Sequence, residues 1–292
     1  MIISVTVTYN GAAVLAPFLE DYKAQIGVEH MLVIVDNAST DGTGALLDAI
    51  DDASIVIIRN DCNVGVAAAN NQGIEEALRR GARRIVLINN DTEFEPDLLA
   101  RLDQSLHDNR ASAISPLIPF YDHPDQIWFG GGRFSKKRGV SMVHDRFKKH
   151  LAVVGKIPFP IDYAPTCCVM FDAAVFAKIG MMDERYFVYW DDVDFMWRMK
   201  RAGLKLVLDP TIRVLHKVSI STGGRLSSFS IKYNFRNQIF YTRKFHGILW
   251  SGYTAFMVML SGAFLLVAKG DRPRHLYLRA KALSEGFAMP RP

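Results

Sequence analysis

The sequence predicts an α/β fold: a mixed, mostly parallel sheet flanked by helices, followed by an apolar helical segment near the C-terminus. Two observations predict it. Within the first 110 residues, short runs rich in β-branched residues alternate with stretches of helical periodicity. Near the other end, residues 248–268 carry no charged side chain over a length that suits a helix. Strand–helix alternation at this spacing favours parallel strands joined by crossover helices.

Four strands and four helices are expected in the first part of the chain. The strands occupy residues 2–8, 31–35, 54–58 and 84–88, and the helices occupy residues 14–24, 43–50, 66–80 and 96–108. Residues 111–218 mix short strand-like runs with prolines and three consecutive glycines, which indicates a second half built on the same sheet. The expected division is therefore 1–110, 111–220 and 221–292, where the last part is basic and aromatic before it becomes apolar.

Composition and motifs exclude several classes of protein. The net charge of +5 is modest, and the basic run within residues 136–149 (Lys136, Lys137, Arg138, Arg146, Lys148, Lys149) is interpreted as a solvated face, with no nucleic-acid partner expected. The first strand is not followed by a GxGxxG fingerprint and no GxxxxGK[ST] occurs, which argues against a dehydrogenase and a P-loop NTPase. The three cysteines lack metal-ligand spacing and fit a reduced compartment, and the N-terminus carries no secretory signal pattern.

Polar residues follow the end of every predicted strand. In parallel sheets, ligands bind beyond the carboxyl ends of the strands, so these residues are candidates for a common site. Some of them also suit turns and helix caps, which is the alternative interpretation for each. The polar residues at these strand ends are Tyr9, Asn10, Asp36, Asn37, Asn60, Asn63, Asn89, Asn90 and Asp91, and Thr8 at the end of the first strand is a further candidate.

Five segments together resemble family 2 glycosyltransferases, and most closely their rhamnosyltransferase-like branch. They are VTYN at 7–10, VDNASTDGT at 35–43, NVGVAAANNQGI at 63–74, LINNDTEF at 87–94 and GMMDERYFVYWDDVDFMWRMKRAGLKL at 180–206. Their order matches the family over roughly residues 1–245. The resemblance implies a GT-A fold and an inverting, metal-dependent glycosyltransferase that uses a nucleotide-diphosphate sugar. It implies residues 1–110 as the donor half and 111–220 as the acceptor half.

The resemblance also implies roles at the donor site. Tyr9 can stack on the nucleotide base, and Asp36 can accept an N–H of a uracil-like base. Asn63, Gly65 and Asn70 lie in a turn leading into a helix, where backbone amides suit a diphosphate. Asp36 remains open to interpretation as a cap, and residues 63–70 as an ordinary helix start.

A metal site is implied at Asp91, the DxD-like position, with Mg²⁺ or Mn²⁺ as the expected cation. The first acid of a strict DxD is replaced by Asn89. His216 follows the strand-like run LKLVLDPTIRVLH and is placed by the resemblance at the metal or the diphosphate. Glu93 either assists or faces solvent.

The acidic cluster at 191–194 is the expected catalytic centre. The resemblance places the general base on the second acid of an ED-like pair, here Asp192, with Asp191 as its neighbour and the other candidate. Asp194 is interpreted as a first-turn acid stabilised by the helix dipole. Arg236 and Asn237 suit either a phosphate contact or a helix surface, and Cys167 and Cys168 are interpreted as packing residues.

Residues 248–268 have basic residues on both sides, which favours a helix or helical hairpin lying in the cytoplasmic interface of a membrane. A buried core helix is the alternative. The resemblance implies a role in bacterial cell-surface polysaccharide synthesis, at the inner face of the cell membrane, with a saccharide or lipid-linked acceptor. The expected donor is dTDP-rhamnose, and a UDP-hexose or furanose donor stays open. An inactive, membrane-associated sugar-nucleotide-binding protein is the competing function.

Overall fold

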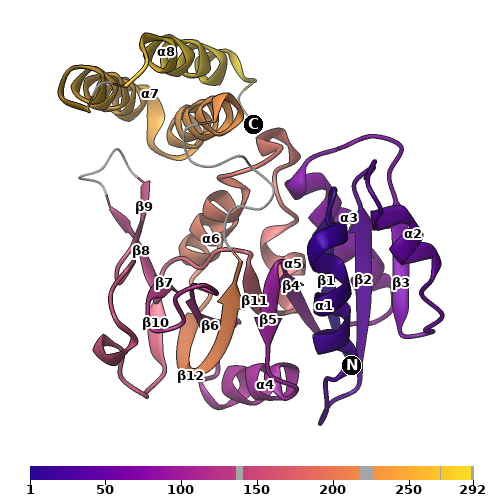
Figure 1. Ribbon diagram of the computed structural model, residues 1–292. Helices are drawn as coiled ribbons and strands as arrows, with labels where there is room; N and C mark the ends of the chain where they lie inside the picture. The colour runs from indigo at the N-terminus through magenta and orange to yellow at the C-terminus, as the bar shows by residue number, and fades with distance from the viewer. Residues whose placement is uncertain (136–140, 218–226, 270, 291–292) are drawn as a thin grey trace.

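A computed structural model describes residues 1–135, 141–217, 227–269 and 271–290. A central sheet has helices packed on its faces, and two further helices form a layer near the C-terminus (Figure 1). Lys136, Lys137 and Arg138 of the basic run, and the expected boundary at 220/221, lie outside the described residues.

The first half of the sheet is parallel, as the sequence predicts. Its strands lie in the order β4-β1-β2-β3, and Thr8 at the end of β1 is level with Asp36 at the end of β2. The strands are β1 (Ile2–Thr8), β2 (His30–Asp36), β3 (Ile55–Arg59) and β4 (Arg84–Ile88). The helices are α1 (Ala12–Lys23), α2 (Thr43–Asp48), α3 (Val66–Arg79) and α4 (Leu98–Asp108). The expected positions hold, and the ends differ by one or two residues, as is usual for helix termini.

The second half extends the same sheet with strands of mixed direction. β11 (Cys168–Asp172) lies antiparallel between β4 and β6 (Ala113–Pro119), and β12 (Leu206–His216) runs parallel to β6. The remaining strands are β5 (Thr92–Phe94), β7 (Ile127–Phe129), β10 (Phe159–Ile161) and the hairpin β8 (Gly132–Ser135) and β9 (Ser141–His144). β5 pairs with the end of β12, so Thr92 is level with His216.

The core forms because the central strands bury side chains on both faces, which is typical of parallel strands covered by helices. Six of the seven residues of β1 are buried. Helix α3 packs tightly onto β1 at Gly73, where an added Cβ would lie 2.2 Å from Val5 Cγ1. This close approach aligns the start of α3 with the end of the sheet where the polar residues gather.

The remaining helices are α5 (Ala174–Ile179), α6 (Asp191–Arg201), α7 (Ser228–Lys269) and α8 (Pro273–Ala288), with short 3₁₀ turns at Leu151–Val153 and Glu184–Tyr186. Helix α7 is interrupted at Gly247, whose φ is 85°. Its first half packs on the main core through Phe240 and Tyr241, whereas a separate small cluster of Ile239, Val258 and Leu283 joins α7 to α8.

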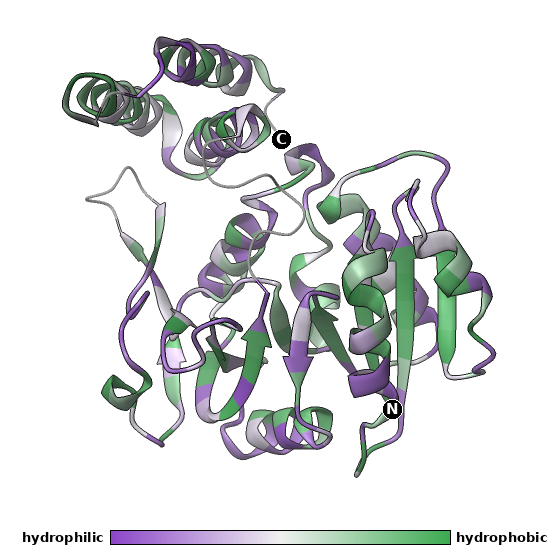
Figure 2. Cartoon of the chain, viewed as in Figure 1, coloured by the Kyte–Doolittle hydropathy of each residue, from purple (hydrophilic) through white to green (hydrophobic). Residues whose placement is uncertain are grey.

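The second half of α7 differs from the other helices because it presents large apolar side chains to solvent. Leu249, Phe256, Phe264 and Val267 are 87%, 62%, 61% and 86% exposed. Figure 2 shows hydrophobic residues along this C-terminal layer. By length and composition alone the helix could cross a membrane, and only 22% of its most apolar window is buried. A buried core helix, the alternative interpretation from sequence, is therefore wrong.

Candidate active site

The loops after β1 and β2 are held together by hydrogen bonds. Asn10 donates its backbone amide to Ser39 Oγ at 2.9 Å and accepts the Thr40 amide on its side chain at 2.8 Å. Asp36 is 6% exposed and accepts the Ser39 amide at 3.1 Å. The turn-forming alternative thus accounts for one carboxylate oxygen of Asp36. Tyr9, by contrast, is 44% exposed, so its ring is accessible to a ligand.

Asn37 holds the loop before α3, a role that sequence reasoning did not assign. It is buried, donates to Asn63 Oδ1 at 2.9 Å, and accepts the Val64 amide at 3.0 Å. Asn63 in turn accepts the Gly65 amide at 3.0 Å. Asn63 therefore shapes the turn that begins α3, because its Oδ1 accepts from both Asn37 and the Gly65 amide.

Gly65 is required by a close contact across the site. Its φ is 89°, and an added Cβ would lie 2.5 Å from the carbonyl oxygen of Phe187. The Val66 amide donates to that same carbonyl at 2.5 Å, so one of the free amides at the start of α3 is already bonded. Asn70, one turn further, is buried with a relative exposure of 6%. Gly65 thus allows the start of α3 to contact the loop that precedes α6.

Asp91 and His216 meet where β5 pairs with β12. Their Oδ1 and Nε2 atoms are 3.4 Å apart. Asp91 Oδ1 and His216 Nδ1 are both buried and make no hydrogen bond within the described part of the chain. Nearby, Asn90 donates to Thr8 Oγ1 at 2.9 Å, which fixes the end of β4 against the end of β1. Glu93 forms an ion pair of 3.7 Å with Lys217, so it does not join the Asp91 pair.

The pair is compatible with a divalent cation as two of its ligands. A carboxylate oxygen without a hydrogen bond beside an imidazole supplies one hard ligand and one that Mn²⁺ accepts. Among the residues that the structure describes, no group of three His, Cys, Asp or Glu side chains is placed to hold a metal ion. Donor phosphates and water would have to complete the coordination.

Asp191 and Asp192 begin α6. Asp191 is 3% exposed, and burial together with the neighbouring Asp192 charge raises its pKa to about 8. Burial also raises the pKa of Asp192, while a hydrogen bond from the Tyr163 hydroxyl to Asp192 Oδ2, at 2.6 Å, acts to lower it. The hydrogen bonds to Asp192 favour it over Asp191 as the charged member of the pair.

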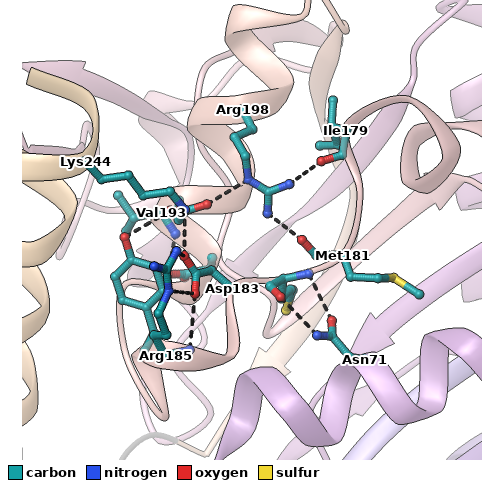
Figure 3. A network of polar contacts seen from close by, with 12 residues as sticks. Asn71, Ile179, Met181, Asp183, Arg185, Val193, Arg198 and Lys244 are labelled. Atoms are coloured by element: carbon teal, nitrogen blue, oxygen red, sulfur yellow. Dashed lines mark hydrogen bonds and ion pairs between the residues drawn. The ribbon is translucent and has the colours of Figure 1, made fainter. Parts of the chain in front are cut away.

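Asp194 belongs to the ion-pair network that includes Asp183, Arg185 and Lys244, which are labelled in Figure 3. It is fully buried and binds Arg198 Nε at 2.7 Å and Lys244 Nζ at 2.6 Å. Lys244 also binds Asp183 at 2.7 Å, and Asp183 binds Arg185. Asp194 lies in the first turn of α6, as expected, and its ion pairs attach α7 to the start of α6.

The loop between this network and the acidic pair is strained. Phe187, Tyr189 and Trp190 have φ values of 60°, 61° and 73°, a region that residues other than glycine rarely adopt. The Asn237 amide donates to the carbonyls of Tyr186, Val188 and Tyr189 at 2.7 to 2.9 Å. Arg236 also donates hydrogen bonds to the carbonyls of Arg185 and Tyr186, and the Tyr233 ring stacks on the Phe187 ring.

Arg236 and Asn237 thus bind loop carbonyls. The exposed helix surface considered from sequence does not apply to Asn237, which is fully buried, and the phosphate contact stays a prediction. Asn237 instead holds the conformation that sets the start of α6. Cys167 and Cys168 are buried packing residues, as expected, and burial raises the pKa of both thiols.

An aromatic wall joins the Asp91 pair to the Asp192 pair. The Trp128 ring lies 4.4 Å from the His216 ring and 5.7 Å from the His144 ring, measured between centroids. His144 lies 5.8 Å from Tyr163, whose hydroxyl reaches Asp192. The candidate metal ligands and the candidate base therefore lie at opposite ends of one continuous wall.

Comparison with known proteins identifies related sequences. The family model described as "Glycosyl transferase family 2" matches residues 4–180. The dTDP-rhamnosyl transferase RfbF of Shigella flexneri is 26% identical over 221 residues, which cover 74% of this chain and 69% of that protein. The N-acetylglucosaminyl-diphospho-decaprenol L-rhamnosyltransferase of Mycobacterium tuberculosis is 27% identical over 249 residues, covering 75% and 76%. The low-salt glycan biosynthesis hexosyltransferase Agl10 of Haloferax volcanii is 24% identical over 239 residues, covering 79% and 73%.

Solved structures share the fold. GalNAc-T7, crystallised with UDP, GalNAc and Mn²⁺, superposes with a TM-score of 0.69 at 16% identity, over 97% of this chain and 54% of that one. The mannosyltransferase PcManGT of Pyrobaculum calidifontis, with GDP-Man and Mn²⁺, gives a TM-score of 0.58 at 17% identity, over 100% and 76%. This chain thus spans about half the length of GalNAc-T7. The likeness confirms the expected GT-A fold.

Proposed function

Because the chain belongs to glycosyltransferase family 2, we propose that it transfers a sugar, with inversion, from a nucleotide-diphosphate donor to a saccharide or lipid-linked saccharide. The observation that carries this proposal is the placement of the Asp91–His216 pair and the Asp191–Asp192 pair at the two ends of one wall. Two of the relatives are named rhamnosyltransferases, which supports dTDP-rhamnose as the first donor to test.

The donor nucleotide is proposed to bind at the ends of β1 and β2. The exposed ring of Tyr9 stacks on the base, and the carboxylate oxygen of Asp36 that does not bond Ser39 accepts a base N–H. Thr8, Asn10 and Asn90 build the loops behind the nucleotide.

The diphosphate is proposed to reach the start of α3 and the Asp91 pair. Asn63 and Gly65 shape the turn there, and Asn70 follows within the helix. A divalent cation held by Asp91 and His216 would offset the charge that develops on the departing nucleotide diphosphate. The Mn²⁺ in GalNAc-T7 and PcManGT structures supports testing that ion first.

Asp192 is the proposed general base. The acceptor hydroxyl oxygen attacks the anomeric carbon, its proton passes to Asp192, and the bond from that carbon to the diphosphate oxygen breaks with its electron pair leaving on the nucleotide diphosphate. Asp191 is the weaker candidate because burial and the Asp192 charge raise the pKa of Asp191 to about 8, which leaves it protonated at neutral pH. One displacement with one base gives inversion.

We further propose that the second half of α7 lies on the cytoplasmic membrane surface. Its exposed apolar side chains suit the headgroup–acyl boundary, and Arg272 and Arg274 at the start of α8 suit anionic lipid. Phe256→Glu is expected to reduce co-sedimentation with phosphatidylglycerol vesicles several-fold. Ile26→Glu, which changes an equally exposed apolar residue far from α7 in the sequence, is the matched control. Equal binding by both variants would contradict the membrane proposal.

The transfer proposal is tested with labelled dTDP-rhamnose and UDP-sugars on lipid-linked acceptors, with NMR of the product's anomeric configuration. Asp192→Asn is expected to reduce kcat by about 10²–10⁴-fold, the usual contribution of a general base. The control is Asp108→Asn, which changes an exposed carboxyl on α4. A retained anomeric configuration would overturn the single displacement. Donor binding without any transfer or hydrolysis in the wild type would favour the sugar-nucleotide-binding alternative.

A further inference from the structure

Tyr163 contacts the proposed base, and no motif in the sequence pointed to it. It lies five residues before β11, is 2% exposed, and donates its hydroxyl proton to Asp192 Oδ2 over 2.6 Å. The other oxygen, Asp192 Oδ1, accepts the Val193 amide at 2.7 Å. Both oxygens of the carboxylate are thus held, and each keeps a second lone pair for a further proton.

The position of Tyr163 is fixed by its surroundings. The carbonyl of Gly132 accepts the amides of Asp162 and Tyr163 at 2.9 and 3.2 Å. A Cβ added to Gly132 would lie 2.7 Å from the Tyr163 ring, so the backbone of β8 packs directly on the tyrosine. The ring also contacts Phe129 and His144, with centroids 6.1 and 5.8 Å away. The hydroxyl therefore has one fixed direction, toward Asp192.

The hydroxyl acts as a donor under all ordinary conditions. Burial and the Asp192 charge raise the pKa of Tyr163 well above its usual value, so it stays protonated. A hydrogen bond from a fixed donor stabilises the charged form of a carboxylate. Asp191, the adjacent acid, has no hydrogen bond from another side chain in the described residues.

We propose that Tyr163 is a positioning residue for the general base: its hydroxyl orients the Asp192 carboxylate and keeps the charge of the acidic pair on Asp192 rather than Asp191. This inference rests on the proposed function, since it requires Asp192 to be the base. Tyr163 is the residue of the aromatic wall that lies next to Asp192, so the wall also fixes the orientation of the proposed base.

Several other titratable groups lie near the pair. They are Asp194, His144, Cys167 and the Asp162–Lys200 ion pair. Burial lowers the pKa of His144 and raises the pKa of Cys167, so both are neutral at pH 7. Asp194 is ion-paired with Lys244 and Arg198. A change in the acid limb of activity therefore reports on the Asp191–Asp192 pair.

The test compares Tyr163→Phe with Tyr186→Phe. Tyr186 is also fully buried and donates its hydroxyl to a carboxylate, but to Asp194 at 3.0 Å. Both variants lose one buried hydrogen bond, so a structural effect is common to both. Only Tyr163→Phe is expected to lower kcat at pH 7, by about tenfold, and to move the acid limb of the kcat profile up by about one pH unit.

A second measurement does not depend on that variant folding. Infrared pH titrations of the two single variants compare the acids one at a time: Asp191, left in Asp192→Asn, should ionise at a higher pH than Asp192, left in Asp191→Asn. If Asp192 ionises at the higher pH instead, the charge of the pair lies on Asp191 and the inference is overturned. If the pH profiles of Tyr163→Phe and Tyr186→Phe coincide, Tyr163 has no positioning role. If Asp192→Asn keeps full transfer activity, the proposed base itself is wrong, which is a separate failure.

Discussion

Replacing Lys244 with methionine removes the cation that two buried carboxylates share. The Lys244 ammonium lies 2.7 Å from Asp183 Oδ2 and 2.6 Å from Asp194 Oδ2. The exposed fractions of the three side chains are 11%, 10% and 0%. Solvent therefore screens these pairs weakly, and methionine fills a similar volume without the charge.

The expected loss in the free energy of unfolding is about 3–5 kcal/mol, the range observed when one member of a buried ion pair is removed. Asp194 would retain Arg198 and the Tyr186 hydroxyl, and Asp183 would retain Arg185. These remaining partners place the expectation toward the lower end of the range.

The pH dependence of stability gives an independent check that these ion pairs stabilise the fold. Burial acts to raise the pKa of Asp183, but hydrogen bonds from Arg185 and Lys244 outweigh it and lower the pKa from 3.8 to about 2. A lowered carboxyl pKa stabilises the fold above pH 4, and this contribution is lost as the pH falls through 2. It amounts to about 2 kcal/mol. Lys244→Met should lose less stability than the wild type between pH 4 and 2.

The assay is equilibrium unfolding in urea at pH 7 and at several acidic values. Lys232→Met is the matched control, because it changes an exposed lysine on the same helix and should stay within about 0.5 kcal/mol of the wild type. A loss below about 1 kcal/mol for Lys244→Met, or one equal to that of Lys232→Met, would refute the reasoning.

Three further outcomes follow from single positions. Gly65→Ala should lower the free energy of unfolding by about 3 kcal/mol or more, because the new Cβ meets the loop before α6. Gly81→Ala, also at positive φ but with nothing within 4 Å of its Cβ, should lower it by about 1 kcal/mol. Similar melting temperatures for the two variants would contradict this. Asp191→Asn should stabilise the protein more at pH 9 than at pH 5. The pKa of Asp191 is raised to about 8, so wild-type stability falls as the pH rises from 4 through 8. Parallel curves of unfolding free energy against pH for the two proteins would count against this. With a thiol reagent, exposed Cys62 should react rapidly in the native protein and the two buried cysteines only after unfolding; rapid reaction of all three would show that the core around β11 opens.

The first half of the sheet was predictable because β1, β2 and β4 are continuous strands whose residues are mostly buried. β1 and β4 begin and end at the predicted residues, and the polar residues after them indicated that the loops meet at one end of the sheet. In the second half, the strand-like run that ends at His216 was recognised and corresponds to β12, whereas most of the other strands are short, mixed in direction and joined by loops. Its shared sheet with the first half depends on pairing between β11 and β4, which no local pattern reveals.

The contacts that shape the site were also beyond local sequence signals. Tyr163 reaches Asp192 across 29 residues, and Lys244 reaches Asp194 across 50. Such contacts depend on how helices and loops fold onto one another, and no local signal in the sequence indicated either contact. Gly65 illustrates the same limit: the sequence indicates a phosphate turn, whereas the structure shows a contact with Phe187 that forbids any side chain.

The most direct test of the account is calorimetric titration with dTDP and UDP, each with and without Mn²⁺, on the wild type, Asp91→Asn and Asp192→Asn. The account predicts that one nucleotide binds only when Mn²⁺ is present, that Asp91→Asn weakens this binding at least tenfold, and that Asp192→Asn leaves it unchanged. Nucleotide binding that needs no metal and survives Asp91→Asn would contradict the donor site. Failure of both nucleotides to bind with Mn²⁺ would contradict it as well.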